Sequence, residues 1–233
     1  MRNSFPADLV LGPVFVGKVE TRWQGRPASA IAKTPVRGRV WLAGTGLRGD
    51  EQADLAVHGG PEKALHHYAA DHYPFWREKM PDRGDRFAPG GFGENVSTVG
   101  LSEEQLCIGD VLRLGEATVQ ISQGRQPCWK LSAHMERPDM AAKFQRSGRT
   151  GWYYRVLREG YLEEGAPVEL VERPQPEWRL SAVIAARFDP KLDPEIAGRL
   201  AGLEQLSPSW RKGFMRKAMP GYVEDTSPRL AGT

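Results

Sequence analysis

The chain has 233 residues, of which 40% are hydrophobic and 26% charged, as is usual for a globular protein of one large or two smaller domains. Its 32 basic and 29 acidic residues are well mixed and leave a net charge of +3, which provides no basic stripe for nucleic acid. No apolar run approaches the ~18 residues of a membrane helix, and no secretory signal is evident. We therefore expect a cytoplasmic protein with neither membrane nor nucleic-acid partners. Two cysteines exclude a disulfide scaffold.

The whole chain holds 26 glycines and 18 prolines, and these residues recur at short intervals through the first 170 positions. Short β-branched, aliphatic runs lie between these residues and predict strands. The predicted strands are residues 14–18, 30–34, 40–42, 111–114, 117–121, 152–158 and 168–171. Short strands at such regular intervals are typical of a barrel or a sandwich rather than a doubly wound sheet. The expected fold is therefore mainly β.

Two helical insertions are expected within this β region. Residues 63–79 carry apolar and aromatic side chains, and Pro74 either limits the helix or starts a second one. Residues 139–146 follow Pro138, which is a favourable helix start.

The character of the sequence changes after two prolines at positions 174 and 176. Three short helices are predicted, at residues 180–187, 193–203 and 207–217. Asp193 and Ser207 are good N-caps, and each precedes a proline at the first helical position. The sequence thus predicts a β domain at residues 1–174 and a small three-helix domain at 175–233 that packs on it.

Cys128 is the most informative single residue. It follows a predicted strand and lies between Arg125 and Lys130. The thiolate is the nucleophilic and metal-binding form of cysteine, and nearby cations favour it. Cys107, between Leu106 and Ile108, is typical of an inert buried thiol.

Three glycine-containing segments are further candidates. In the first, His58 precedes Gly59 and Gly60, which would let the backbone approach an anion at the following helix start; a simple tight turn is the alternative. In the second, glycines surround Phe92 before Glu94 and Asn95, so the loop either presents Asn95 to a heterocycle or forms a bulge or hairpin turn.

The third segment, residues 148–155, holds Arg149 and Arg155, either of which could bind a phosphate; a solvated charge at a strand edge is the alternative. A histidine-ligated zinc site is not favoured. His67 and His72 are five positions apart, about 140° around a helix, and no His-Glu-x-x-His motif occurs.

Several of these motifs occur together in an order and at spacings that resemble those of the MOSC domain family, and within it the YiiM-like branch, which is tied to resistance against 6-N-hydroxylaminopurine. The matching segments are residues 49–52, 57–61, 92–95, 108–110, 122–131 and 148–152, with residues 206–210 in a helical extension. Related chains often have proline at the position of Gly124, which predicts a looser turn before Cys128 here.

The resemblance implies a MOSC-type β-barrel with helical insertions and a three-helix C-terminal domain, which holds a molybdenum cofactor (molybdopterin). It implies that Cys128 is the metal ligand, and that His58 and Asn95 join it as catalytic residues. The cofactor-binding residues implied are Gly59, Gly60, Lys63, Phe92, Gly93, Glu94, Ser122, Gln123, Arg125, Lys130 and Arg149. A soft thiolate suits such a metal.

Three functions are compatible with these residues. The first is a molybdenum-dependent oxidoreductase that reduces N-hydroxylated compounds such as 6-N-hydroxylaminopurine, with electrons from an external flavin or iron–sulfur reductase, since the chain has no flavin or haem signature. The second is a carrier of the cofactor or of sulfur as a Cys128 persulfide. The third is a partner-binding module in which Cys128 is structural. The sequence leaves the choice between monomer and homodimer open.

Overall fold

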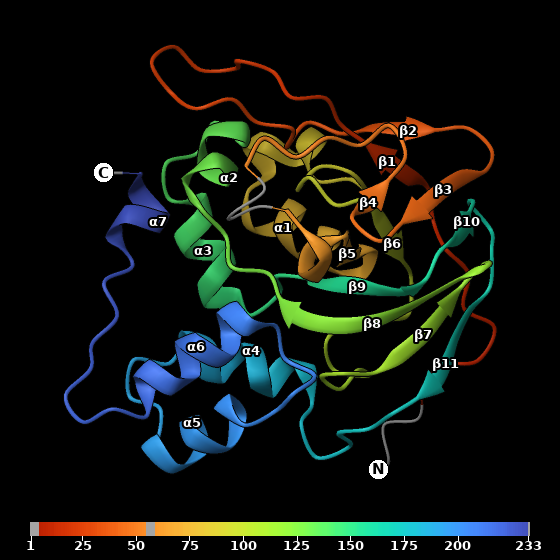
Figure 1. Ribbon diagram of the computed structural model, residues 1–233. Helices are drawn as coiled ribbons and strands as arrows, with labels where there is room; N and C mark the ends of the chain where they lie inside the picture. Colours follow the sequence, from red (N-terminus) through yellow and green to blue (C-terminus); the bar gives the residue numbers. More distant parts are fainter. Residues whose placement is uncertain (1–4, 55–58, 233) are drawn as a thin grey trace.

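The strands form two sheets in the computed structural model, which describes residues 5–54 and 59–232. The larger sheet has the order β11-β7-β8-β9-β5-β6-β1-β2, and the smaller has the order β10-β3-β4 (Figure 1). The strands are β1 (Val14–Val16), β2 (Thr34–Val36), β3 (Val40–Ala43), β4 (Gly46–Leu47), β5 (Leu65–Ala69), β6 (Val96–Thr98), β7 (Val111–Leu114), β8 (Ala117–Gly124), β9 (Trp152–Arg158), β10 (Gly160–Leu162) and β11 (Val168–Glu172).

The larger sheet is mixed: β5 and β6 pair in parallel, and its other neighbours pair antiparallel. Its end strands, β11 and β2, are not paired with each other among the described residues, so the expected closed barrel is not confirmed. The segment before β1 approaches β11, because Leu11 N donates to Ala166 O and Val168 N to Leu9 O, both at 2.9 Å. The architecture is thus a sheet-dominated fold with helices and a helical C-terminal region.

The helices lie in two groups (Figure 1). The first comprises α1 (Tyr73–Lys79), α2 (Trp129–His134) and α3 (Met140–Ser147), with the 3-10 helix η1 (Pro61–Lys63) before β5 and the 3-10 helices η2 (Ala70–His72) and η3 (Pro81–Arg86) after it. The second is C-terminal and comprises α4 (Leu180–Phe188), α5 (Pro194–Ala201) and α6 (Pro208–Lys217), followed by the short α7 (Ser227–Ala231).

Two hydrophobic clusters fix these elements. In the larger, Ile121 and Trp152 of the sheet are fully buried together with Ile184 of α4 and Trp210 of α6, so the helical region shares a core with the sheet. In the smaller, aromatic cluster, Phe92 packs with Tyr68, Tyr73, Trp76 and Phe144.

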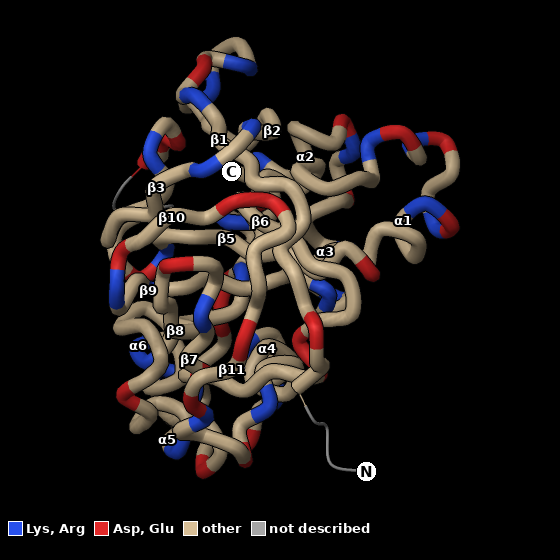
Figure 2. The backbone as a smooth tube through the Cα atoms, turned by 90° about the vertical axis from the view of Figure 1, so that its right-hand side faces the viewer, with Lys and Arg blue, Asp and Glu red and all other residues tan. Residues whose placement is uncertain are grey.

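The predicted C-terminal helices are confirmed, including their start signals. Asp193 accepts a hydrogen bond from Glu195 N at 2.7 Å, and Ser207 accepts one from Trp210 N at 3.3 Å. The helix predicted at 139–146 is confirmed as α3. None of the helices in the described part of the chain is long and apolar enough to cross a membrane. Basic and acidic residues alternate over the backbone, as expected (Figure 2).

Two local predictions are wrong. Residues 65–69, expected in a helix, form β5, which pairs with β9 and β6. All five residues are buried, so no alternation of buried and exposed positions marks this strand. Residues 30–34, expected as a strand, contribute only Thr34 to β2. Helix α2, which starts directly after Cys128, and the strands β4, β6 and β10 were not predicted.

Candidate active site

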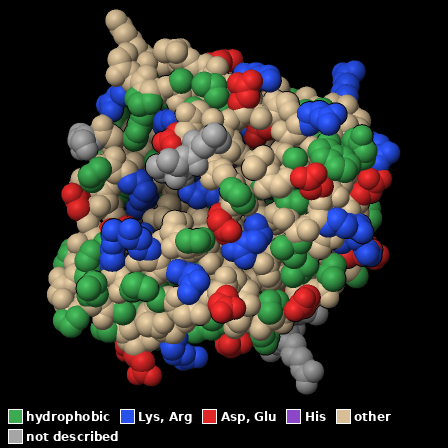
Figure 3. Space-filling view, in the orientation of Figure 1, with side chains coloured by type: hydrophobic (Ala, Val, Ile, Leu, Met, Phe, Trp, Pro, Cys, Tyr) green, Lys and Arg blue, Asp and Glu red, His purple; other side chains and the backbone are tan. Residues whose placement is uncertain are grey.

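A cavity opens where the end of β8, the start of β5 and the chain after β1 meet. It encloses about 710 Å³ of space between atoms, part of it open to solvent. Lys and Arg side chains gather around a hollow near the centre of the face shown in Figure 3. The described lining residues are Ser29, Ala30, Ile31, Lys33, Asp50, Glu51, Gln52, Ala53, Lys63, His66, Gly93, Asn95, Arg125, Gln126, Cys128, Lys130 and Tyr153.

Cys128 lies on the wall of this cavity. It is the N-cap residue of α2, with extended backbone angles (φ −128°, ψ 173°), and so occupies the turn between β8 and that helix. Its side chain is half-buried and forms no disulfide, whereas Cys107 is buried. The thiol is therefore reachable from the cavity.

The two cations that flank Cys128 in sequence line the same cavity but are held by backbone carbonyls. Arg125 Nη1 donates to Phe92 O at 2.6 Å, and the guanidinium lies over the Phe144 ring, 5.4 Å from its centroid. Lys130 Nζ donates to Ala28 O at 2.9 Å. Both side chains are buried, so their charges are fixed in place at the cavity wall.

A third cation, Lys63 of η1, also interacts electrostatically with Cys128. Burial lowers the pKa of Lys63, and interactions with Asp54 and Cys128 oppose that shift. Arg229 of α7 behaves in the same way: burial lowers its pKa, and Glu224 and Cys128 oppose it. Cys128 thus interacts with cations from two parts of the chain that are far from it in sequence.

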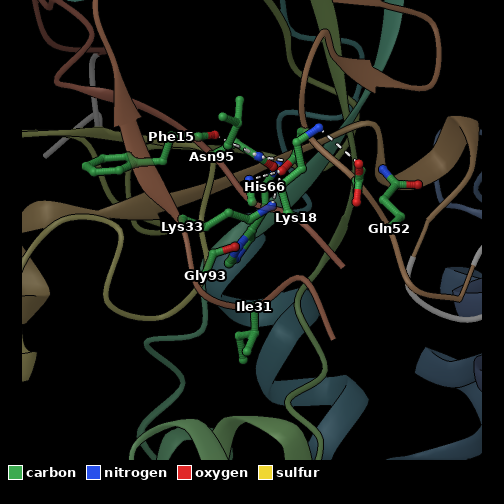
Figure 4. A network of polar contacts seen from close by, with 12 residues as sticks. Phe15, Lys18, Ile31, Lys33, Gln52, His66, Gly93 and Asn95 are labelled. Carbon is green, nitrogen blue, oxygen red and sulfur yellow. Dashed lines mark hydrogen bonds and ion pairs between the residues drawn. The ribbon is translucent and has the colours of Figure 1, made fainter. Parts of the chain in front are cut away.

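A buried polar network forms part of the cavity wall (Figure 4). Asp50 pairs with Lys33 at 2.5 Å through Oδ1 and accepts from Asn95 Nδ2 at 2.8 Å through Oδ2. Asn95 Oδ1 in turn accepts from His66 N at 3.1 Å. Burial lowers the pKa of Lys33, and the charge and hydrogen bond of Asp50 oppose this. The network therefore fixes Asn95 rather than leaving it mobile.

His66 presents an acceptor with no partner among the described residues. Its Nδ1 lies 3.3 Å from Gly93 O, and since a carbonyl only accepts, Nδ1 carries the proton. Burial, with the nearby charge of Arg125, lowers the pKa of His66 well below 6.5, so the ring is neutral and Nε2 has a bare lone pair. Within residues 5–54 and 59–232, that buried Nε2 has no hydrogen-bond partner. The ring faces Tyr153 at a centroid distance of 4.8 Å.

Six predicted site residues come together at the cavity: Lys63, Gly93, Asn95, Arg125, Cys128 and Lys130. Seven lie outside its described lining: Gly59, Gly60, Phe92, Glu94, Ser122, Gln123 and Arg149. The last predicted residue, His58, falls outside the described residues.

Several of these seven have structural contacts instead. Glu94 is fully buried and accepts from Tyr73 Oη and from the backbone N–H of Gly90 and Phe92, which fixes the glycine loop. Its pKa is raised by burial. Arg149 lies over the Phe75 ring, 4.2 Å from its centroid.

Gly60 N donates to Gln52 Oε1 at 3.2 Å, and Ser122 Oγ donates to Glu62 O at 2.6 Å. Gln123 is bonded to Ser207 at the start of α6. These contacts hold the turns that surround the cavity together.

Eleven of the described lining residues were not predicted as site residues, and four of these belong to the polar network or contact it: Lys33, Asp50, His66 and Tyr153. Asp50 belongs to segment 49–52, one of those that resemble the family, so that motif already indicated a site residue there. The other three are brought to the cavity by tertiary packing, and their local sequence gave no sign of that.

Comparison with known proteins assigns the family. Residues 54–169 match the MOSC domain model, and residues 178–217 match the model of a YiiM-like, 3-alpha helix domain. The chain is 41% identical over 219 residues to Protein YiiM of Escherichia coli, covering 94% of this chain and 97% of that protein. The crystal structure of YiiM from Escherichia coli matches with a TM-score of 0.80 at 33% identity, over 95% of this chain and 98% of that one.

The chain therefore belongs to the MOSC domain family, in the YiiM-like branch with a three-helix domain. A protein of Gibberella moniliformis named Reductase is 41% identical over 167 residues, which cover 70% of this chain and 30% of that protein.

Proposed function

We propose that the chain is a molybdenum-cofactor-dependent reductase of N-hydroxylated compounds such as 6-N-hydroxylaminopurine. The observation that carries the proposal is a half-buried thiol, Cys128, on the wall of a cavity that Lys63, Arg125, Lys130 and Asn95 also line. MOSC domains are associated in general with this cofactor, and the reductase name of one relative supports redox chemistry.

The donor set of the cavity fits this cofactor. No group of three or more histidine, cysteine, aspartate or glutamate side chains suited to a metal ion occurs among the described residues. A bare ion would therefore find too few ligands, whereas a metal that brings its own dithiolene sulfurs needs a single protein thiolate. Cys128 can supply that thiolate, and a soft sulfur ligand suits molybdenum.

The cations would hold the anionic part of the cofactor. Arg125 and Lys130 hold positive charge in place at the cavity wall, and Lys63 adds a third cationic side chain, which favours a phosphate. When bound, the cofactor supplies the two-electron redox chemistry. Reduction of an N-hydroxyl group to an amine consumes two electrons and two protons and releases water.

The remaining lining residues would orient the substrate. His66 Nε2 is a buried acceptor, so it favours a ligand that presents an N–H or O–H donor, as hydroxylamino groups do. Leaving such an acceptor unpaired is unfavourable, which selects for that donor. Lys63 Nζ, whose pKa is lowered by burial, is a stronger acid than an exposed lysine and is suited to donate a proton.

The domain organisation and the source of electrons form part of the same proposal. Residues 1–174 would form a MOSC-type barrel domain and residues 175–233 the helical domain. An external flavin or iron–sulfur reductase in the cytoplasm would deliver the electrons.

Turnover by cofactor-loaded protein tests the proposal. With a chemical reductant, we expect conversion of 6-N-hydroxylaminopurine to adenine, its loss in Cys128→Ala and its retention in the matched control Cys107→Ala. Absence of turnover in the wild type, or full turnover in Cys128→Ala, would contradict the proposal. A persulfide on Cys128 in freshly isolated, inactive protein would instead favour the carrier function, and mass spectrometry detects it.

A further inference from the structure

The C-terminal segment, residues 218–232, runs back from the three-helix region to the Cys128 turn. Figure 1 shows it leaving α6 and returning to lie beside α2 and α3 as α7. Glu224 fixes the stretch of this segment between α6 and α7, because both its carboxylate oxygens accept from Arg187, whose side chain is 8% exposed. Gly232 O accepts from Arg26 Nη1 at 2.8 Å and fixes the end.

Arg229 lies between these two anchors and reaches the residue before Cys128. Its Nη1 donates to Pro127 O at 2.5 Å, and its Nη2 donates to Gln145 Oε1 of α3 at 2.7 Å. A guanidinium is planar, and its donors have a fixed relative direction. The two bonds therefore tie the carbonyl of the Pro127–Cys128 peptide to α3.

The three-helix region holds the other side of the same turn. Ser207 N donates to Ser122 O at 2.8 Å, and Ser207 Oγ donates to Gln123 Oε1 at 2.7 Å. Gly124 then packs directly against Ile184. The turn from Gly124 to Cys128 is thus held at its start by packing and hydrogen bonds from α4 and α6, and at its end by the hydrogen bond from Arg229 of α7.

The geometry points to Arg229 as a positioning residue for Cys128, which sets the direction of the thiol into the cavity through the Pro127 carbonyl. This gives the C-terminal segment a role in the active site although Arg229 is not among the described cavity-lining residues. The catalytic consequence rests on the proposed function, whereas the positioning itself does not.

Hydrogen exchange of the full-length, cofactor-free chain tests the positioning. Arg229→Gln should raise amide exchange in the peptide covering residues 125–131 by about tenfold, the size expected when one charge-assisted hydrogen bond is lost. Arg229→Lys keeps a cationic donor and should restore most of the protection. The matched control is Arg146→Gln, which removes an exposed arginine of α3 next to Gln145.

Two results would overturn the inference. One is exchange in residues 125–131 of Arg229→Gln within twofold of the wild type. The other is an equal rise in Arg146→Gln, or a rise spread evenly over all peptides, which would report general loosening.

Kinetics of cofactor-loaded protein give a second readout. Because Arg229 acts on the orientation of Cys128 and not on substrate contacts, Arg229→Gln should lower kcat by about tenfold with KM unchanged. A rise in KM at constant kcat would contradict positioning. If the wild type shows no turnover, the proposed function fails, and the exchange result still decides the role of Arg229.

Discussion

Gly124, the last residue of β8, lies so close to Ile184 of α4 that a Cβ atom at position 124 would come within 2.4 Å of Ile184 Cγ1. The same Cβ would lie 2.8 Å from Cη2 of Trp210. Both neighbours are fully buried and have no room to move aside. The absence of a side chain at this glycine lets the helical region pack against the Cys128 turn, and the looser turn expected there stays a prediction.

Gly124→Ala should destabilise the protein by about 1–3 kcal/mol, because an added methyl overpacks this contact. Gly198→Ala in α5 is the matched control, since no atom lies within 4 Å of its added Cβ. That control should be neutral or stabilising by up to ~1 kcal/mol through helix propensity. Urea denaturation measures both, and equal stability of the two variants would contradict the packing argument.

Asp50→Ala should destabilise the fold by about 3–5 kcal/mol, because it leaves the buried Lys33 ammonium without its carboxylate. The pair is nearly inaccessible, with side-chain exposures of 7% for Lys33 and 4% for Asp50. Adding Lys33→Met should recover part of the loss. Lys18→Met, which breaks the exposed pair with Glu51, should cost no more than about 1 kcal/mol. A loss in Asp50→Ala as small as in Lys18→Met would refute the assignment.

The stability of the fold should fall as the pH drops from about 6.5 to 3, in part through His67. Burial lowers the pKa of His67 to about 3 from an ordinary value of 6.5. Within that window the unfolded chain binds a proton that the folded chain does not, so the unfolding free energy decreases with decreasing pH.

His67→Gln cannot take up this proton, and its stability should depend less steeply on pH, by about 1.4 kcal/mol per pH unit. Denaturation between pH 6.5 and 4.5 measures the two slopes. The variant also loses hydrogen bonds to Tyr154 and Thr98, so its absolute stability is lower and only the slope is diagnostic. Identical slopes would show that His67 is protonated in the folded state.

Cys128 should react with iodoacetamide at least about tenfold faster than Cys107 in the folded protein, because thiolate fraction and access control the rate. Cys107 is 6% exposed, and burial raises its pKa. Mass spectrometry should find a single early label on Cys128, and Cys128→Ser should remove it. Labelling of Cys107 first, or of both at one rate, would contradict the assigned exposures.

The sequence predicted the parts of this structure that depend on local chemistry. The caps at Asp193 and Ser207 use side-chain oxygens within a few residues, so their helices could be predicted from short segments. The turn after β8 and the place of Cys128 followed from a β-branched run and its polar end.

What could not be predicted depends on partners distant in sequence. Strand β5 shows no alternation of buried and exposed residues, because all five of its residues are buried, and only the tertiary structure shows this. His66 is a candidate site residue because of its contacts with Tyr153 and Gly93, both of which are distant from it in sequence. Arg125 and Lys130 line the cavity beside Cys128 as expected, whereas its electrostatic interactions with Lys63 and Arg229, both distant in sequence, were not predicted.

The bonds between residues 9–11 and 165–168 have a consequence for biogenesis. Synthesis proceeds from the N-terminus, so the segment before β1 cannot form these hydrogen bonds until residue 168 has left the ribosome. Long sequence separation of this kind slows folding, because the loop must close before the contact stabilises it. We expect nascent chains that end before residue 168 to expose an unpaired sheet edge and to depend on chaperones until the sheet is complete.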